Sequence, residues 1–436
     1  MDISEKIMIP TPVTAKKISM ETLNAKLSGP VFACSGNDNG VSYLFFADVH
    51  ESLANECLPC KSLNDDLTDN NPPGSENCWH ITRLLSDIFS KDGVIADMFL
   101  EIPFIGKSAP RPSKREIKSS ISRVGEINKL HYLFFDCFDK KQCKFKNVRF
   151  HYVNNRHRYT IGSEGELLYK HNTLEKVGLI PLINKSLEII NYISKTKIIY
   201  HELKEHIELT NQILTEFFSN NIGFKLLKLI LTSDNYSKDV SSLLDSLLGK
   251  IPNEEEIMSD IIFSNLLVDR EGKNMHRVRA QLYALSQEGQ EEVVSKITKF
   301  ILDKYSETIR DDELMQKWNN FMTLYKKLIK GVIVNDNEII KTSSEVKNIV
   351  GFFDYRNSYI MDSYILGRMF RTFPETQHKI SNKRTVYAGV NHIITLTEFF
   401  EKEMNVSFNK YGSSRSVSTD SNKINRCIDI DINKFL

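Results

Sequence analysis

The feature that most constrains this chain is a change in the spacing of its apolar residues. Between residues 173 and 349 apolar side chains recur every three or four positions, as at Leu179, Ile183 and Leu187, which predicts six to eight helices. On both sides of that block, short apolar runs alternate with helical segments, which is typical of a parallel or mixed sheet. We therefore expect an α/β protein whose mixed sheet core comes from both ends of the sequence and carries a large all-helical insertion.

The changes in pattern also predict where the parts of the chain begin and end. Residues 1–29 contain two closely spaced prolines and are expected to form an irregular N-terminal arm. Residues 30–172 are the first part of the α/β core, residues 173–349 the helical insertion, and residues 350–436 the second part of the core. Because the two outer parts carry complementary polar motifs, we expect them to share one core.

Composition narrows the class of protein. The chain has 57 Lys and Arg against 56 Asp and Glu, a net charge of +1, so we do not expect a dedicated nucleic-acid or membrane-surface protein. We interpret the basic residues of 107–123 and 140–149, which lie near aromatic residues, as a solvated surface beside a core helix. The sequence has no run of about 20 apolar residues, so no membrane-spanning helix is expected.

Polar side chains follow three predicted strands, at the carboxyl end of each: Asp48, His50 and Glu51 after the first, Glu101 after the second, and Asn391 and His392 after the third. Open α/β sheets bind ligands beyond the carboxyl ends of their strands, so we expect these groups to meet. Zinc and manganese accept imidazole and carboxylate ligands, which makes a candidate catalytic metal site of Asp48, His50, Glu101 and His392. Such groups also orient and deprotonate water. The alternative is that each of these side chains only caps a helix or forms hydrogen bonds with a loop.

One arginine is a candidate for holding an anionic substrate. Arg356 falls in the first turn of a helix predicted over residues 355–372. The fork of a guanidinium binds carboxylates and other oxyanions, so Arg356 can hold an anion if it points into the site. The alternative is an arginine on a solvated helix face.

These motifs resemble those of the superfamily that joins erythromycin esterases, ChaN-like haem-binding lipoproteins, TraB/PrgY proteins and Tiki proteases. Residues 46–51 (FADVHE) resemble its first motif, and Leu100-Glu101 resembles its second acidic strand end. Residues 356–361 resemble its Arg-Asp-x-x-Met helix, and residues 386–392 its terminal Gly-x-x-His strand. The arrangement resembles still more closely proteins encoded by mimivirus-like giant viruses.

The resemblance implies a site and an activity. It places His50, Glu101 and His392 at the superfamily's inward polar positions and Arg356 at its arginine, and Glu51 adjoins the first motif's histidine. Erythromycin esterases use such a histidine as a base, Tiki proteins hold a metal at such positions, and ChaN-like proteins bind haem without catalysis. The resemblance therefore implies a metal- or histidine-dependent hydrolase of ester or amide bonds, with zinc or manganese ahead of haem as the expected cofactor.

Three departures from the superfamily pattern support other hypotheses. Ala47-Asp48 stands where Gly-Glu is usual, Arg356-Asn357 where Arg-Asp is usual, and Asn154-Asn155 where the viral relatives have an acid. The alternatives are a catalytically degenerate structural or host-interaction protein of a giant virus, and a haem- or metal-binding protein. A viral protein is expected in the virion or the host cytoplasm, and any other in the cytoplasm.

The cysteines suggest a separate structural site. Cys57-x-x-Cys60, followed by Cys78-x-His80, gives four ligands for a structural zinc ion, and the first pair has the usual zinc spacing. The alternatives are a disulfide among these three cysteines, or free thiols. An odd total of seven cysteines argues against a disulfide scaffold. Three further cysteines are expected to be core or incidental thiols: Cys34, Cys137 and Cys143.

Overall fold

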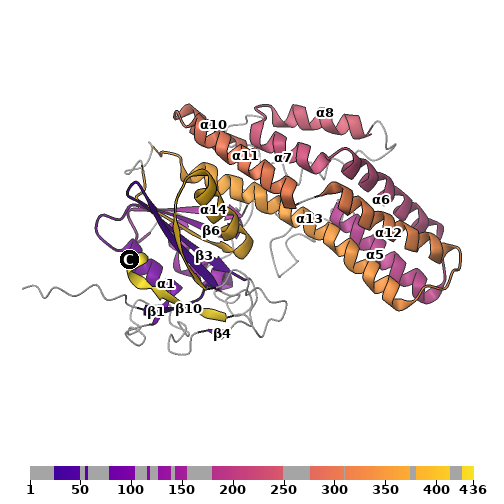
Figure 1. Ribbon diagram of the computed structural model, residues 1–436, viewed down its shortest axis with the longest axis horizontal. Helices are drawn as coiled ribbons and strands as arrows, with labels where there is room; N and C mark the ends of the chain where they lie inside the picture. The colour runs from indigo at the N-terminus through magenta and orange to yellow at the C-terminus, as the bar shows by residue number, and fades with distance from the viewer. Residues whose placement is uncertain are drawn as a thin grey trace, which may run out of the picture.

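The chain forms a mixed α/β structure, as the sequence predicts. The computed structural model describes residues 24–49, 55–56, 78–103, 115–117, 126–138, 143–154, 179–248, 275–308, 310–373, 380–412 and 425–436. Within them are two sheets with parallel and antiparallel strands and a large helical region (Figure 1). No helix in the described part of the chain is both long and apolar enough to cross a bilayer.

The larger sheet joins the two ends of the sequence. Its strands, in spatial order, are β7 (Val148–Asn154), β6 (Ala96–Pro103), β8 (Lys383–Gly389), β3 (Val41–Asp48), β2 (Phe32–Asp38) and β9 (Phe408–Gly412). The first four run parallel, and β2 and β9 pair antiparallel. Strand β8 lies between β3 and β6, so the second part of the sequence supplies a central strand to a sheet begun by the first.

Burial on both faces explains the continuous apolar runs of the central strands. Leu44, Phe45 and Phe46 of β3 are all fully buried, although successive side chains point to opposite faces. Phe45 belongs to the core shared with α13 and α14, whereas Leu44 and Phe46 belong to a second core on the other face. The sheet is therefore the middle layer between two hydrophobic cores.

The second core is closed by short helices and by a smaller sheet. The helices on this side are α1 (Ile81–Phe89), α3 (Glu126–Leu133) and α4 (Phe135–Phe138). The four strands of the smaller sheet, in spatial order, are β4 (Asn55–Glu56), β10 (Asn425–Asp431), β1 (Asn24–Ser28) and β5 (Cys78–His80), and η4 (Ile432–Lys434) follows β10.

Residues 24–28, which the sequence analysis assigns to an irregular arm, form β1. This strand pairs antiparallel with β10 and parallel with β5. Leu27 is fully buried while Lys26 is exposed, so the strand does alternate, but over only five residues. A pattern this short gives no local signal, and its main partner lies about 400 positions away along the sequence.

In the described part of the chain, the helical region has eight helices: α5 (Leu179–Thr196), α6 (His201–Ser219), α7 (Ile222–Thr232), α8 (Tyr236–Leu248), α10 (Arg277–Gln287), α11 (Glu291–Thr308), α12 (Asp311–Ile329) and α13 (Asp336–Met369). Helices α5, α6 and α12 pack with the first half of α13 into a bundle that extends away from the sheets (Figure 1). Buried Trp318 stacks on Phe321 and donates to Asn211 across this bundle.

Helix α13 connects the bundle to the sheet. It has 34 residues, or about 50 Å at 1.5 Å per residue, and starts at Asn335, whose side chain accepts the Glu338 N–H. The helix runs without a break through residues 349–350, where the sequence analysis places a boundary. The apolar pattern changes there because α13 exchanges bundle partners for the sheet and α14 (Val390–Glu403), not because the helix ends.

Candidate functional site

Three neighbouring parallel strands bring the predicted polar groups to one edge of the sheet. The strands β6, β8 and β3 lie side by side, so their carboxyl ends coincide. Glu101 lies near the end of β6, and Asp48 ends β3 directly opposite Gly389, the last residue of β8. Helix α14 begins at the next residue and carries His392 in its first turn. The expected convergence therefore follows from the strand order.

His392 is held by a carboxylate from helix α13. Its Nδ1 lies 2.6 Å from Asp362 Oδ1, and both side chains are almost completely buried. Because an ionised carboxylate only accepts hydrogen bonds, the proton of this pair belongs to Nδ1. The hydrogen bond fixes the ring orientation and leaves Nε2 as the nitrogen that can accept a proton.

Nε2 of the same imidazole faces Glu101. The distance from Nε2 to Glu101 Oε1 is 3.7 Å, which is too long for a direct hydrogen bond. The other oxygen, Oε2, accepts the backbone N–H of Gly389 at 2.7 Å. This bond holds the carboxylate at the N-terminal end of α14, where the helix dipole favours a negative charge.

The resulting arrangement is a histidine between two carboxylates from different elements. Asp362 from α13 orients the ring, while Glu101 from β6 stands across from the nitrogen that can take a proton. A histidine oriented in this way acts as a general base in many hydrolytic sites. The chemistry open to this site is therefore proton abstraction from a water or a substrate group placed at Nε2.

Two residues predicted for this site, His50 and Glu51, lie outside the described residues, as do the segments that begin at residue 104 after β6 and at residue 155 after β7. Asp48 is described and buried, and its register opposite Gly389 brings it to the same strand ends as Glu101. The structure thus joins His392 with Glu101 and Asp362, and adds Asp48 at the same edge.

Arg356 lies in a different environment from the one expected. It is buried on α13, where its guanidinium interacts electrostatically with the hydroxyl groups of Tyr236 and Tyr305 from α8 and α11. Burial lowers the pKa of Arg356 and raises that of both tyrosines. Six residues separate Arg356 from Asp362, which turns their side chains roughly 120° apart around the helix. The alternative of a solvated surface arginine is wrong, and a role in anion binding stays a prediction.

The described residues offer two donors of the kind that a divalent metal requires. His392 Nε2 and Glu101 Oε1 suit zinc or manganese in chemistry and lie close enough to share an ion. Among the described residues, no group of three or more His, Cys, Asp or Glu side chains is arranged for a metal. The predicted set also includes His50, which lies outside the described residues.

Asp362 is the site residue that the sequence analysis misses. Asn357 stands where the superfamily has an acid. The carboxylate that contacts His392 belongs instead to Asp362, five positions later. One signal was available: Asp362 is the only charged residue between Arg356 and Arg368, in a stretch that is otherwise mostly apolar. A lone acid on a buried helix face requires a polar partner.

A second buried charge network lies at the opposite edge of the sheet. Asp97, near the start of β6, accepts two hydrogen bonds from Arg149 and one contact of 2.7 Å from His151. Arg368 of α13 donates to the other nitrogen of His151 at 2.8 Å. Burial lowers the pKa of His151 to about 4. Each charged or titratable side chain of this network is hydrogen-bonded to another side chain of the protein. We therefore interpret the network as a structural connection between the sheet and α13.

The cysteine cluster differs from the zinc hypothesis at one ligand. Cys78 is disulfide-bonded, so it has no thiolate to give a zinc ion. His80 caps α1, with its Nδ1 2.8 Å from the hydroxyl of Thr82. Cys57 and Cys60 lie outside the described residues. The structure therefore removes Cys78 from the predicted zinc ligands, while a disulfide among Cys57, Cys60 and Cys78 stays a prediction.

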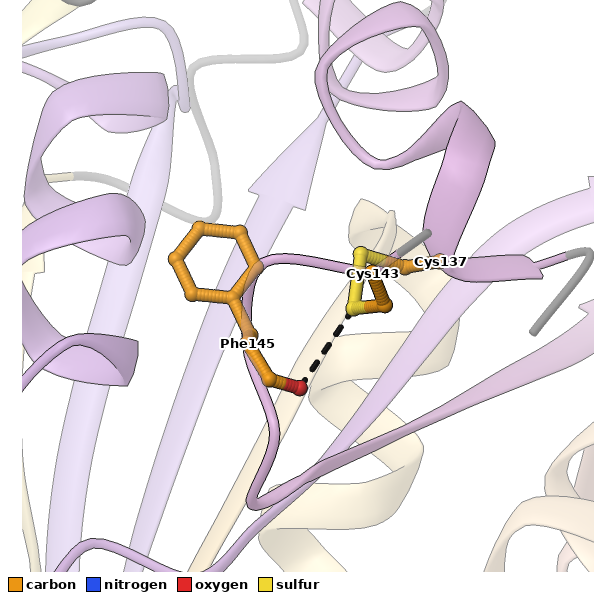
Figure 2. Close-up of a disulfide and its surroundings, with 3 residues drawn as sticks. All are labelled: Cys137, Cys143 and Phe145. Carbon is orange, nitrogen blue, oxygen red and sulfur yellow. Dashed lines mark hydrogen bonds between the residues drawn. A yellow bond between two sulfur atoms is a disulfide. The ribbon is translucent and has the colours of Figure 1, made fainter. Parts of the chain in front are cut away.

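Two cysteines predicted to be incidental thiols form a disulfide instead. Cys137 and Cys143 are bonded to each other, and the Cys143 sulfur lies 3.4 Å from the carbonyl oxygen of Phe145 (Figure 2). Cys427 is also disulfide-bonded, whereas Cys34 is a free and buried thiol. The expectation of thiols at Cys137 and Cys143 is wrong, because pairing depends on the distance between two cysteines in the folded chain, which the sequence pattern does not report.

No protein-family model, no curated protein and no solved structure matches this chain. The chemistry of the site is therefore argued from its geometry.

Proposed function

We propose that this protein is a hydrolase of ester or amide bonds in which His392 is the general base. The observation that carries the proposal is the 2.6 Å contact between His392 Nδ1 and Asp362 Oδ1, which leaves Nε2 directed toward the edge of the sheet. Open α/β folds place their reactive groups at this edge. The superfamily resemblance in the sequence points to the same histidine.

The residues have separate tasks in this proposal. His392 takes the proton of the attacking water at Nε2, and Asp362 stabilises the imidazolium that forms. Glu101, held by the Gly389 N–H, then lies 3.7 Å from the new positive charge and stabilises it further. Asp48 lies at the same strand ends, next to the expected position of the reacting bond.

A divalent metal at the same place is the second candidate. His392 Nε2 and Glu101 Oε1 would hold it, and zinc or manganese bound there would supply a Lewis acid. Asp362 would then orient the ligating imidazole from behind, which is a common arrangement around histidine ligands. Elemental analysis of the purified protein separates the two candidates.

The test compares three variants on a panel of p-nitrophenyl esters and fluorogenic amides. We expect His392→Ala to lower kcat/KM by at least about 1000-fold, and Asp362→Asn by about 100-fold or more, because that amide orients the ring less well. His206→Gln is the matched control, since His206 lies in the helical bundle, where its Nε2 contacts the Leu182 carbonyl oxygen. It should keep full activity.

Two outcomes would overturn the proposal. One is wild-type activity in a folded His392→Ala protein. The other is a wild-type protein that hydrolyses nothing in the panel and contains no metal, which would support the catalytically degenerate structural or host-interaction protein. Circular dichroism of each variant shows whether a loss of activity reflects unfolding.

The cysteines bear on where the protein works. Cys78, Cys137, Cys143 and Cys427 are disulfide-bonded, and disulfides persist mainly in oxidising surroundings. Of the locations that the viral resemblance implies, this favours packaging in the virion over residence in a reducing cytoplasm.

A further inference from the structure

Exposed apolar side chains gather at one end of the helical bundle. Seven of the ten large apolar residues that are exposed in the described part of the chain lie there. Six of them form what we call the apolar tip: Ile198, Ile199, Tyr200, Val332, Ile333 and Ile340. The seventh, Tyr192, stacks against Tyr200. Ile333 is 95% exposed, which is far from the usual state of an isoleucine.

Two connections that are distant in sequence meet at this tip. Residues 197–200 link α5 to α6, and residues 330–335 link α12 to α13. Helix α12 packs against both α6 and α13, and α5 packs against α6, so the two connections lie at the same end of the bundle (Figure 1). Lys327 of α12 pairs with Glu338 of α13 across the second connection. The tip is also the end of the bundle that lies farthest from the sheets (Figure 1).

The two connections at the apolar tip and the helix ends before them carry lysines and no acidic residue. Residues 193–201 and 326–335 contain five lysines and no aspartate or glutamate, although the whole chain is nearly neutral. Lys195, Lys197 and Lys330 are exposed. Acidic residues resume in the first turns of α6 and α13, where Glu202 and Asp336 are exposed and Glu338 is paired with Lys327.

We propose that the apolar tip docks on an anionic lipid surface. Isoleucine and valine side chains enter the boundary between headgroups and acyl chains, tyrosine sits at the headgroup level, and lysines bind acidic headgroups. All three kinds of side chain are present here, on two short connections. A stable protein interface buries about 20–30 residues on each side, whereas the tip offers only a few. The set is therefore suited to shallow insertion into lipid.

Docking by the tip would hold the candidate site away from the membrane. Ile340 and Asp362 lie on the same continuous helix, about 33 Å apart at 1.5 Å per residue. The bundle would then act as a spacer with the strand ends at a fixed height. This inference rests on the tip alone and does not depend on the proposed hydrolase activity.

The test is flotation of the full-length protein with vesicles. We expect binding to phosphatidylcholine vesicles that contain phosphatidylserine, and weak binding to phosphatidylcholine alone. Ile333→Asp should lower the partition coefficient about tenfold, because the most exposed apolar side chain of the tip is lost and a negative charge replaces it. The pair Lys197→Glu and Lys330→Glu should lower it by at least about fivefold for each lysine and reduce its dependence on salt.

Matched controls come from other exposed positions. Ile380→Asp changes an isoleucine that is 59% exposed and lies next to the sheet, and Lys225→Glu changes an exposed lysine of α7; neither should alter binding. Absence of wild-type binding to anionic vesicles would overturn the proposal. So would binding that Ile333→Asp leaves unchanged, or a wild-type dimer in light scattering that Ile333→Asp dissociates, which would identify a second copy as the occupant.

Discussion

Individual buried residues decide most of the polar chemistry of this protein. His392 obtains a defined tautomer only because Asp362 is placed on a helix that packs over the strand ends. Asp97 is ionised in the interior because Arg149 and His151 bind both of its oxygens and hold its pKa far below the usual range. In each case the protonation of one buried side chain depends on a hydrogen-bonded partner from another element.

Two buried histidines predict how stability depends on pH. Burial lowers the pKa of His131 and of His151 to about 4, whereas histidine in the unfolded chain titrates near 6.5. Between these values the unfolded chain binds more protons, so stability is complete above about pH 6.5 and falls as the pH drops toward 4. We expect a loss of ~1–3 kcal/mol for each histidine, measured by urea unfolding at several pH values.

A pair of variants shows whether these histidines are responsible. His131→Gln should reduce the slope of stability against pH by about half, because one of the two groups no longer titrates. His201→Gln alters an exposed histidine and should leave the slope unchanged. A free energy of unfolding that is flat between pH 6.5 and 4.5 would contradict the prediction.

At the scale of elements, α13 shows what the sequence pattern reports. The periodicity correctly predicts helix on both sides of residues 349–350. The apolar pattern depends, however, on which elements pack against a helix as well as on whether a helix is present. One face of α13 packs in the bundle and a later face packs against α14 and the sheet. A change of partner therefore resembles a boundary in the sequence, although the backbone is continuous.

Two helical glycines predict opposite changes in stability. A Cβ at Gly223 of α7 would collide with the hydroxyl of Tyr305, whereas a Cβ at Gly351 of α13 meets no atom within 4 Å. We expect Gly223→Ala to destabilise the protein by about 1–3 kcal/mol through overpacking. Gly351→Ala should stabilise it by about 0.5–1 kcal/mol, because alanine favours the helix. Urea unfolding of both variants is the measurement, and equal shifts of the same sign would contradict the packing argument.

The whole molecule is a sheet assembled from both ends of the chain and joined to a projecting helical bundle. Four of the described cysteines are disulfide-bonded: Cys78, Cys137, Cys143 and Cys427. Among the described cysteines, Cys34 has a free thiol. Burial raises the pKa of this thiol to about 12, which makes it unreactive.

The redox state of the cysteines gives a prediction for the whole molecule. Alkylation of the unfolded, unreduced protein should label Cys34 but not Cys78, Cys137, Cys143 or Cys427. Cys143→Ser should lower the free energy of unfolding by about 2 kcal/mol, the usual effect of opening a short closed loop. Mass spectrometry that finds the Cys137 peptide alkylated without reductant would contradict the assignment.

The sequence alone determined the kinds of elements and the polar groups at their ends. Apolar spacing is a local property, so it predicted the central strands, the helical block and the placing of Glu101 and His392 at strand ends. Only the tertiary structure decided that β8 inserts between β3 and β6, that Asp362 reaches His392, that Arg356 lies among tyrosines, and which cysteines pair. Most of these features depend on contacts between residues far apart in the chain, and such contacts leave no local periodicity in the sequence.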